Sequence, residues 1–249
     1  MPTALIVFIA LTVAGLLIHL LCMRILAWRG VTVRRTKFGL TLLFDTADDD
    51  GTPVRMLNVN GAFQSVAYAT DELWSELACE YQREQACIVS ELPRLSRAAV
   101  IGGGGFSFPK WLVVHLPPVA VSVVEIDEKI IDIARESFGL ARLEREYAGT
   151  GRFELACDEG AATIHEHLAD GGSYLATLRF PLRGRKSQSM YETIETFSRE
   201  FAHVWLVPEY PDDPTHPGNN TLVASDVDLV TAGCEPLRGY EWSVDVTRP

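Results

Sequence analysis

A run of four glycines is the part of this sequence most suited to close contact with a ligand. It follows a short apolar stretch at residues 98–101 and precedes a helix expected at residues 107–115. Glycine lets the backbone approach a ligand closely, and the first turn of a helix presents unpaired N–H groups. The run therefore predicts a crevice for a nucleotide or nucleoside, although a flexible turn has the same composition. Its residues are Gly102, Gly103, Gly104 and Gly105.

Acidic residues stand after the next two predicted strands. Glu125 ends the second strand, 20 residues after Gly105, and a carboxylate there can accept hydrogen bonds from both hydroxyls of a ribose. A helix cap would explain Asp127 but not Glu125. Asp158 follows the third strand, where it can bind the amino group of an adenine as well as cap the next helix.

The elements that must position these residues alternate between strands and helices from Arg97 onward. Such alternation predicts an α/β fold, a doubly wound, mostly parallel, Rossmann-like sheet with helices on both faces. The expected strands are 98–101, 119–125, 152–156, 174–178, 204–207, 221–224 and 241–246. The expected helices are 107–115, 127–138, 159–169 and 188–202.

A smaller β-domain is expected before this sheet. Residues 40–46, 55–60 and 63–69 alternate as strands, and a polar run with three aspartates separates the first two. This pattern predicts an antiparallel hairpin with a solvated turn. Asp71 is suited to cap a helix that runs to about Gln85.

In this order, the elements resemble the spermidine synthase family, the polyamine aminopropyltransferases, within the class I methyltransferase-like superfamily. The resemblance covers about residues 40–226. Residues 57–66 resemble the family's small N-terminal β-domain with its Gly-x-x-Gln element, which adds Gln64 to the expected site. Asp71, Glu72 and Tyr81 resemble positions of the following helix, and residues 220–225 resemble a late core strand.

The resemblance implies a ligand and a reaction. The ligand is decarboxylated S-adenosylmethionine, used as a co-substrate, and its aminopropyl group is transferred to the polyamine putrescine in polyamine biosynthesis. The expected nucleoside-binding residues are Gly102, Gly103, Gly104, Gly105, Glu125, Asp158 and Gln64. The resemblance also suggests a homodimer, since family members often form dimers.

Two positions depart from the family's pattern. Gly105 stands where the family usually has an aspartate that faces the aminopropyl ammonium. Phe180 stands where the aspartate that helps to deprotonate the attacking amine is expected, and phenylalanine cannot accept a proton. A basic stretch surrounds Phe180, and it suits the carboxylate of intact S-adenosylmethionine unless it is a solvated loop. Its residues are Arg179, Arg183, Arg185 and Lys186.

Three functions are therefore compatible with the residues. The first is a spermidine-synthase-like transferase, and the second is a methyltransferase that uses S-adenosylmethionine. The third is a non-catalytic, membrane-tethered protein that keeps the nucleoside pocket. No catalytic residue is assigned, because Phe180 occupies the expected position.

An apolar stretch at residues 3–23, interrupted only by His19, is long enough to cross a bilayer as a helix. Its start carries no basic residue, unlike a typical signal peptide. Basic residues follow it instead, so the positive-inside rule predicts a single-pass anchor with the soluble body in the cytoplasm. A buried core helix is the alternative. The basic residues are Arg24, Arg29, Arg34, Arg35 and Lys37.

Charge and composition limit the partners. The 249 residues include 33 acidic and 22 basic side chains, a net charge of −11, which argues against nucleic acid as the main partner. The acidic balance suits a cationic small molecule such as a polyamine, or simply solubility. The five cysteines contain no CxxC pair, and no metal site is expected. The expected division is an anchor at residues 1–37, a small β-domain at 38–70 and a methyltransferase-like domain at 71–249.

Overall fold

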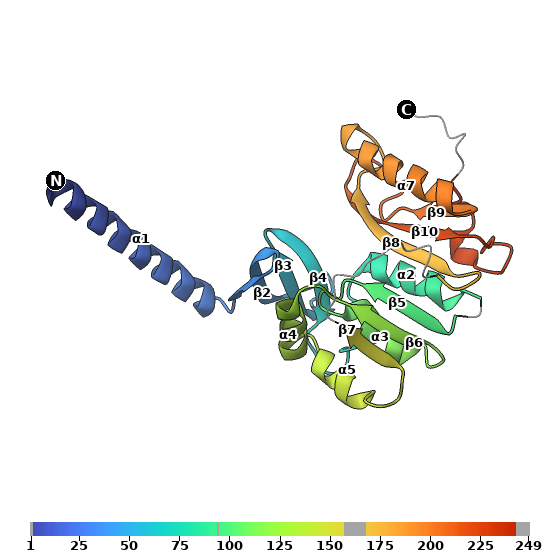
Figure 1. Ribbon diagram of the computed structural model, residues 1–249, viewed down its shortest axis with the longest axis horizontal. Coiled ribbons are helices and arrows are strands. Elements are labelled where there is room, and N and C mark those ends of the chain that lie inside the picture. The colour runs from blue at the N-terminus through green and yellow to red at the C-terminus, as the bar shows by residue number, and fades with distance from the viewer. Residues whose placement is uncertain (1, 94, 157–167, 243–249) are drawn as a thin grey trace.

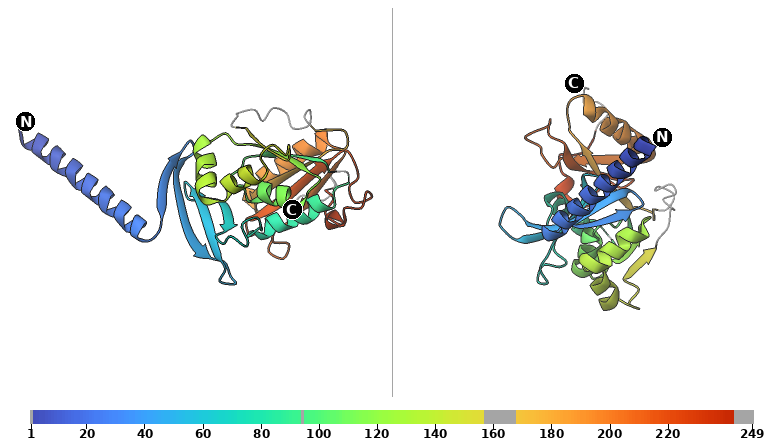
Figure 2. Two further views of the ribbon diagram at one scale, coloured as in Figure 1. Left: turned by 90° about the horizontal axis from the view of Figure 1, so that it is seen from below. Right: turned by 90° about the vertical axis from the view of Figure 1, so that its left-hand side faces the viewer.

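The computed structural model describes residues 2–93, 95–156 and 168–242. A long N-terminal helix projects from a body built of a β-meander and two further small sheets with helices (Figure 1). The four-stranded meander lies between the helix and the rest of the body (Figure 2).

Helix α1 (Pro2–Trp28) is the apolar segment predicted as an anchor. Within the described residues, nothing buries its most apolar 18-residue window, and the helix is long and apolar enough to cross a membrane. Residues 29–31 join it to the first strand. The helix therefore exposes nearly all of its apolar surface, with only Met23 and Leu26 half-buried near its end, unlike a core helix of the same composition.

The β-meander consists of four antiparallel strands in chain order: β1 (Thr32–Thr36), β2 (Gly39–Ala47), β3 (Pro53–Val59) and β4 (Ala62–Tyr68). Asn60 and Gly61 both have positive φ angles of 51° and 84°, as a tight turn between β3 and β4 requires. The three strands predicted from sequence are confirmed. β1 was not predicted, and it lies within the segment expected to belong to the anchor.

A parallel sheet carries the glycine run. Its strands are β5 (Arg97–Ile101), β6 (Ala120–Val124) and β7 (Phe153–Ala156), in the order β5-β6-β7. Helices α3 (Ser107–His115), α4 (Glu128–Ser137) and α5 (Leu140–Glu146) pack their apolar side chains against it in one core. All of these elements except α5 were predicted. The helix predicted at residues 159–169 falls almost entirely outside the described residues.

The remaining described strands form a separate antiparallel sheet, β8-β10-β9, so the prediction of one mostly parallel sheet is wrong. β10 (Gly218–Ser225) lies between β8 (Ser173–Phe180) and β9 (His203–Val207). No described helix separates β9 from β10, and a chain that returns without a crossover helix pairs antiparallel. The helix between β8 and β9, α7 (Gln188–Glu200), was predicted. Glu241 adds one bridge to Trp205, and residues 243–246 of the last predicted strand lie outside the described residues.

Helix α2 (Glu80–Ser90) joins the two sheets, since it contacts both α3 and β10. Its Gln85 donates to the hydroxyls of Thr177 and Thr221 on the antiparallel sheet. The prediction that this helix begins at Asp71 is wrong, because side chains take the carbonyls that a helix would use. Lys110 donates to the carbonyl of Trp74, and Arg83 donates to those of residues 77 and 78.

Candidate functional site

The glycine loop connects the end of β5 to the start of α3 and crosses the tip of β6. The Gly102 N–H donates to the Val124 carbonyl at 2.8 Å. Gly102 and Gly104 have positive φ angles of 83° and 51°, which glycine adopts without steric cost. The loop thus lies at the carboxyl ends of two parallel strands, the edge at which open α/β sheets bind their ligands.

The Glu125 carboxylate lies directly against this loop. One carboxylate oxygen accepts the N–H groups of Gly103 at 2.8 Å and Gly104 at 3.3 Å, and the other accepts the Asp127 N–H at 3.0 Å. Glu125 is only 6% exposed. The loop amides that could bind a phosphate therefore face a buried negative charge, which disfavours an anion and favours a neutral or cationic ligand.

Clashes with the chain's own side chains explain why two of the four loop positions must be glycine. A Cβ atom on Gly103 would lie 2.3 Å from the Phe106 ring, and one on Gly105 would lie 2.5 Å from Ser65 Oγ. Gly102 differs, because among the described residues no neighbouring atom lies within 4 Å of its Cβ position. The open side of the loop is therefore at Gly102.

Strand β4 lies beside the loop, which brings Gln64 to the site. The Gln64 carbonyl lies 3.6 Å from the Cβ position of Gly104, and its side chain is exposed. Ser107 at the start of α3 donates to the Val66 carbonyl at 3.1 Å. Asp158, the residue predicted to bind adenine, lies outside the described residues.

Asp127 has the predicted role of a helix cap. Its carboxylate accepts the Lys129 N–H at 3.0 Å within the first turn of α4. It also accepts the Lys37 N–H at 2.5 Å, from the turn between β1 and β2. The meander is therefore bonded directly to the strand tip that carries Glu125.

The structure packs Phe180 and the glycine loop into different apolar clusters. Phe180 ends β8, at the edge of the antiparallel sheet, and packs into the apolar cluster of Met190 and Ile194 beneath α7. Phe106 of the loop belongs to a different cluster, under the parallel sheet. The loop and Phe180 therefore do not share a core.

A group of acidic residues was missed by the sequence reasoning. Glu80 and Glu84 lie one turn apart on α2, and Glu209 follows β9. Burial raises the pKa of Glu84, and the charges of Glu80 and Glu209 raise it further. One Glu84 oxygen is buried and accepts no hydrogen bond from the described residues. The spacing of Glu80 and Glu84 is visible in the sequence, but only the fold brings Glu209 to them.

Two tyrosines belong to the same group. Burial raises the pKa of Tyr81 above its usual range, with further contributions from Cys79 and Glu209. The charge of Glu209 raises the pKa of Tyr210, which is 42% exposed. Carboxylates combined with aromatic rings suit an organic cation. We call these five residues the acidic–aromatic cluster: Glu80, Tyr81, Glu84, Glu209 and Tyr210.

The cluster does not have the character of a metal or thiolate site. In the part of the chain that the structure describes, no three His, Cys, Asp or Glu side chains are arranged to hold a metal ion. Burial raises the pKa of the neighbouring Cys79 to about 11. Its thiol is therefore protonated at neutral pH and is a poor nucleophile.

Comparison with known proteins identifies the fold. No family model and no curated protein matches the sequence. A probable spermidine synthase from Corynebacterium glutamicum is 17% identical, with a TM-score of 0.60 over 84% of this chain and 87% of the other. The spermidine synthase from Thermotoga maritima is 15% identical, with a TM-score of 0.56 over 81% of this chain and 74% of the other.

A third solved structure is a spermidine synthase in complex with the transition-state analogue AdoDATO. It is 14% identical to this chain, with a TM-score of 0.57 over 81% of this chain and 75% of the other. The resemblance to spermidine synthases is thus confirmed at the level of the fold.

Proposed function

We propose that the body is a spermidine-synthase-like transferase that binds S-adenosylmethionine or its decarboxylated form at the glycine loop. The observation that carries the proposal is the buried Glu125 carboxylate on the amides of Gly103 and Gly104. A carboxylate there can accept hydrogen bonds from the ribose hydroxyls, and its charge disfavours binding of the pyrophosphate of a dinucleotide. The spermidine synthase fold supports the same ligand class.

We further propose that the acidic–aromatic cluster binds the amine that receives the transferred group. An amine that has lost its proton attacks the carbon beside the sulfonium sulfur, a new C–N bond forms, and the C–S bond breaks to leave a thioether. The amine's proton must pass to a base, and Glu84 is suited to take it because one of its oxygens is buried without a hydrogen bond from the described residues and burial raises its pKa. This assigns to Glu84 the task that Phe180 cannot perform.

Methyl transfer from intact S-adenosylmethionine is the second candidate. It is favoured by Gly105, which provides no carboxylate for an aminopropyl ammonium and whose Cβ position is filled by Ser65 and Phe138. In methyl transfer the same amine attack would occur at the sulfonium methyl group. The two candidates thus share the nucleoside site and differ in the donor's side chain.

Calorimetric titration of the full chain in detergent micelles tests the nucleoside site. The ligands are S-adenosylmethionine, its decarboxylated form and methylthioadenosine. Tighter binding of the decarboxylated form supports aminopropyl transfer, and tighter binding of the intact form supports methyl transfer. Binding without turnover of any amine would favour a tethered binding protein, and no binding of any of the three would overturn the proposal.

Glu125→Ala should weaken binding of the preferred nucleoside by about 1.5–3 kcal/mol, or 10- to 150-fold, because charged hydrogen bonds are lost. Glu128→Ala is the matched control, since it removes the same charge from an exposed position three residues away. The far-UV and near-UV circular dichroism of both variants should match that of the parent. An unchanged affinity in a folded Glu125→Ala protein would remove Glu125 from the site.

We also propose that α1 anchors the body to a membrane on the cytoplasmic side. Its length and apolar composition support the anchor. The basic residues that follow it, Arg29, Arg34, Arg35 and Lys37 among them, support the orientation. Labelling of a cysteine placed beside Arg29 with a membrane-impermeant reagent should succeed in inverted vesicles and fail in intact cells.

A further inference from the structure

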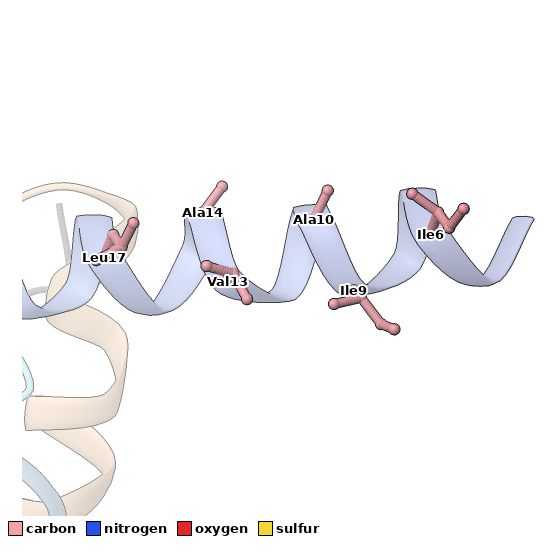
Figure 3. Close-up of a pocket in the computed structure, with 6 residues that line it drawn as sticks. All are labelled: Ile6, Ile9, Ala10, Val13, Ala14 and Leu17. Carbon is pink, nitrogen blue, oxygen red and sulfur yellow. The ribbon is translucent and has the colours of Figure 1, made fainter. Parts of the chain in front are cut away.

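The polar and small side chains of α1 lie along one side of the helix. Thr12, Gly15, His19 and Cys22 follow each other at intervals of three, four and three residues, which keeps them on one side. All four are exposed. The other side carries only apolar side chains, among them Ile6, Ile9, Ala10, Val13, Ala14 and Leu17 (Figure 3). We call the side of the helix that carries Thr12, Gly15, His19 and Cys22 the polar stripe.

His19 is the residue of this stripe that needs a partner. It lies six residues from the middle of the apolar stretch at residues 3–23, about 9 Å from the bilayer centre and inside a hydrocarbon layer about 15 Å deep on each side. The described residues provide no hydrogen bond to its ring. The Thr12 hydroxyl, in contrast, donates to the Phe8 carbonyl at 2.9 Å. An ionisable side chain at such a depth is costly unless it faces another protein helix.

We propose that the polar stripe is a contact between two copies of this chain, in which His19 of one α1 bonds to His19 of the other. This inference rests on the proposal that α1 spans a membrane. A neutral imidazole has one donor and one acceptor nitrogen, so it is complementary to a second copy of itself. Gly15, one turn away on the same stripe, lets the two backbones approach closely.

A second copy fits better than an unrelated helix because it places the same residue at the same depth. Copies of one chain insert with the same orientation, so the two stripes meet in register. Within the described residues, α1 is the one helix that could span a membrane, so none of the other described elements can provide the partner helix, whereas a second copy of the chain can. The same register brings the two Cys22 side chains together, which provides a native probe of the contact.

Oxidative cross-linking of the full chain in lipid vesicles tests the contact. The parent should form a disulfide-linked dimer, and Cys22→Ser should abolish it. The double variant Leu21→Cys, Cys22→Ser moves the thiol by one residue to another side of the helix and should cross-link far less. Equal cross-linking from position 21 would overturn the proposed face.

Energy transfer between labelled chains in the same vesicles tests the role of His19. His19→Leu should weaken the dimer about 3- to 18-fold, the effect expected for one hydrogen bond between membrane helices. His19→Asn retains a donor and an acceptor and should restore most of the affinity. An unchanged dimer in His19→Leu would overturn the role of His19.

Membrane fractionation tests the anchor separately from the contact between two copies of α1. If the chain is absent from the carbonate-washed membrane fraction, the proposal that α1 is a membrane anchor is wrong. If the chain is in that fraction but monomeric, or pairs only with another membrane protein, the anchor stands and the self-contact is wrong.

Discussion

At the scale of single residues, Lys110 is a buried cation held by backbone carbonyls. It is 2% exposed, and its ammonium donates to the carbonyls of Trp74 at 2.7 Å and Phe138 at 2.6 Å. Burial lowers its pKa to about 8. The bonds tie α3 to the loop before α2 and to the end of α4, so Lys110 connects three segments beneath the glycine loop.

This burial predicts a pH dependence of stability. Between about pH 8 and 10.5 the unfolded chain binds the Lys110 proton more tightly than the folded one. The free energy of unfolding should therefore rise with pH across that window, by about 3 kcal/mol in total from this group. Urea unfolding of the full chain in detergent at several pH values measures the slope. The Lys110→Met variant should lose this rise of the unfolding free energy with pH, whereas the exposed control Lys129→Met should keep it.

Glu84 predicts a second effect, on the transfer reaction. If it takes the proton of the attacking amine, Glu84→Gln should lower the rate of transfer by about 100- to 10,000-fold. The affinity for the nucleoside should change little, because Glu84 is not part of the glycine loop. A radiolabelled transfer assay measures the rate, with the exposed Glu200→Gln as control. A rate within twofold of the parent would exclude Glu84 as the base.

At the scale of elements, the turn from β5 to α3 depends on the packing of one aromatic ring. Phe106 has a left-handed φ of 56° and is fully buried. Its ring occupies the space that a side chain on Gly103 would need. The shape of the loop is thus fixed by the protein core as well as by any ligand.

Gly103→Ala should therefore destabilise the fold by about 1–3 kcal/mol through overpacking. The smaller ring-free side chain of Phe106→Leu should relieve part of this cost in the double variant. Gly102→Ala is the control, since its cost comes from a positive φ of 83° and not from a clash, and Phe106→Leu should not relieve it. Chemical unfolding of the three single variants and the two double variants measures the coupling, and additive losses for Gly103 and Phe106 would contradict the packing argument.

Local patterns predicted the elements better than the way they pair. The glycine run, the tip of β6 and the Asp127 cap depend on neighbouring residues, and each lies where the sequence placed it. The helix expected to begin at Asp71 does not form, because side chains from later in the chain bind the carbonyl groups of this segment. Arg83 and Lys110 are the donors. Tertiary contacts of this kind have no signal in a local window.

The pairing of β8, β9 and β10 was missed for a related reason. Each strand has the apolar composition expected of a buried strand, and composition does not specify direction. The segment between β9 and β10 contains four prolines and no helical pattern, which favours a direct antiparallel return. The cluster of Glu80, Glu84 and Glu209 depends on that return, so it could not be predicted before the pairing was known.

At the scale of the whole molecule, we expect the proposed anchor α1 to be separable from the body. A chain that begins at Gly30 retains β1 and hence the complete meander. We expect it to appear in the supernatant after carbonate extraction, whereas the full chain stays with the membrane, because among the described residues α1 alone provides a long apolar surface. Its nucleoside affinity should equal that of the full chain. A shortened chain that remains in the carbonate pellet would contradict the assignment of α1 as the anchor.

The three residues between Trp28 and Thr32 have a consequence for where chemistry can take place. Fully extended, so short a link spans only about 10 Å, so an anchored body cannot diffuse away from the lipid headgroups. Arg29, in the link itself, would lie near anionic phospholipids and further restrict its tilt. The body would then meet substrates only within a thin layer above the bilayer. Solutes or proteins that are concentrated in that layer would bind first.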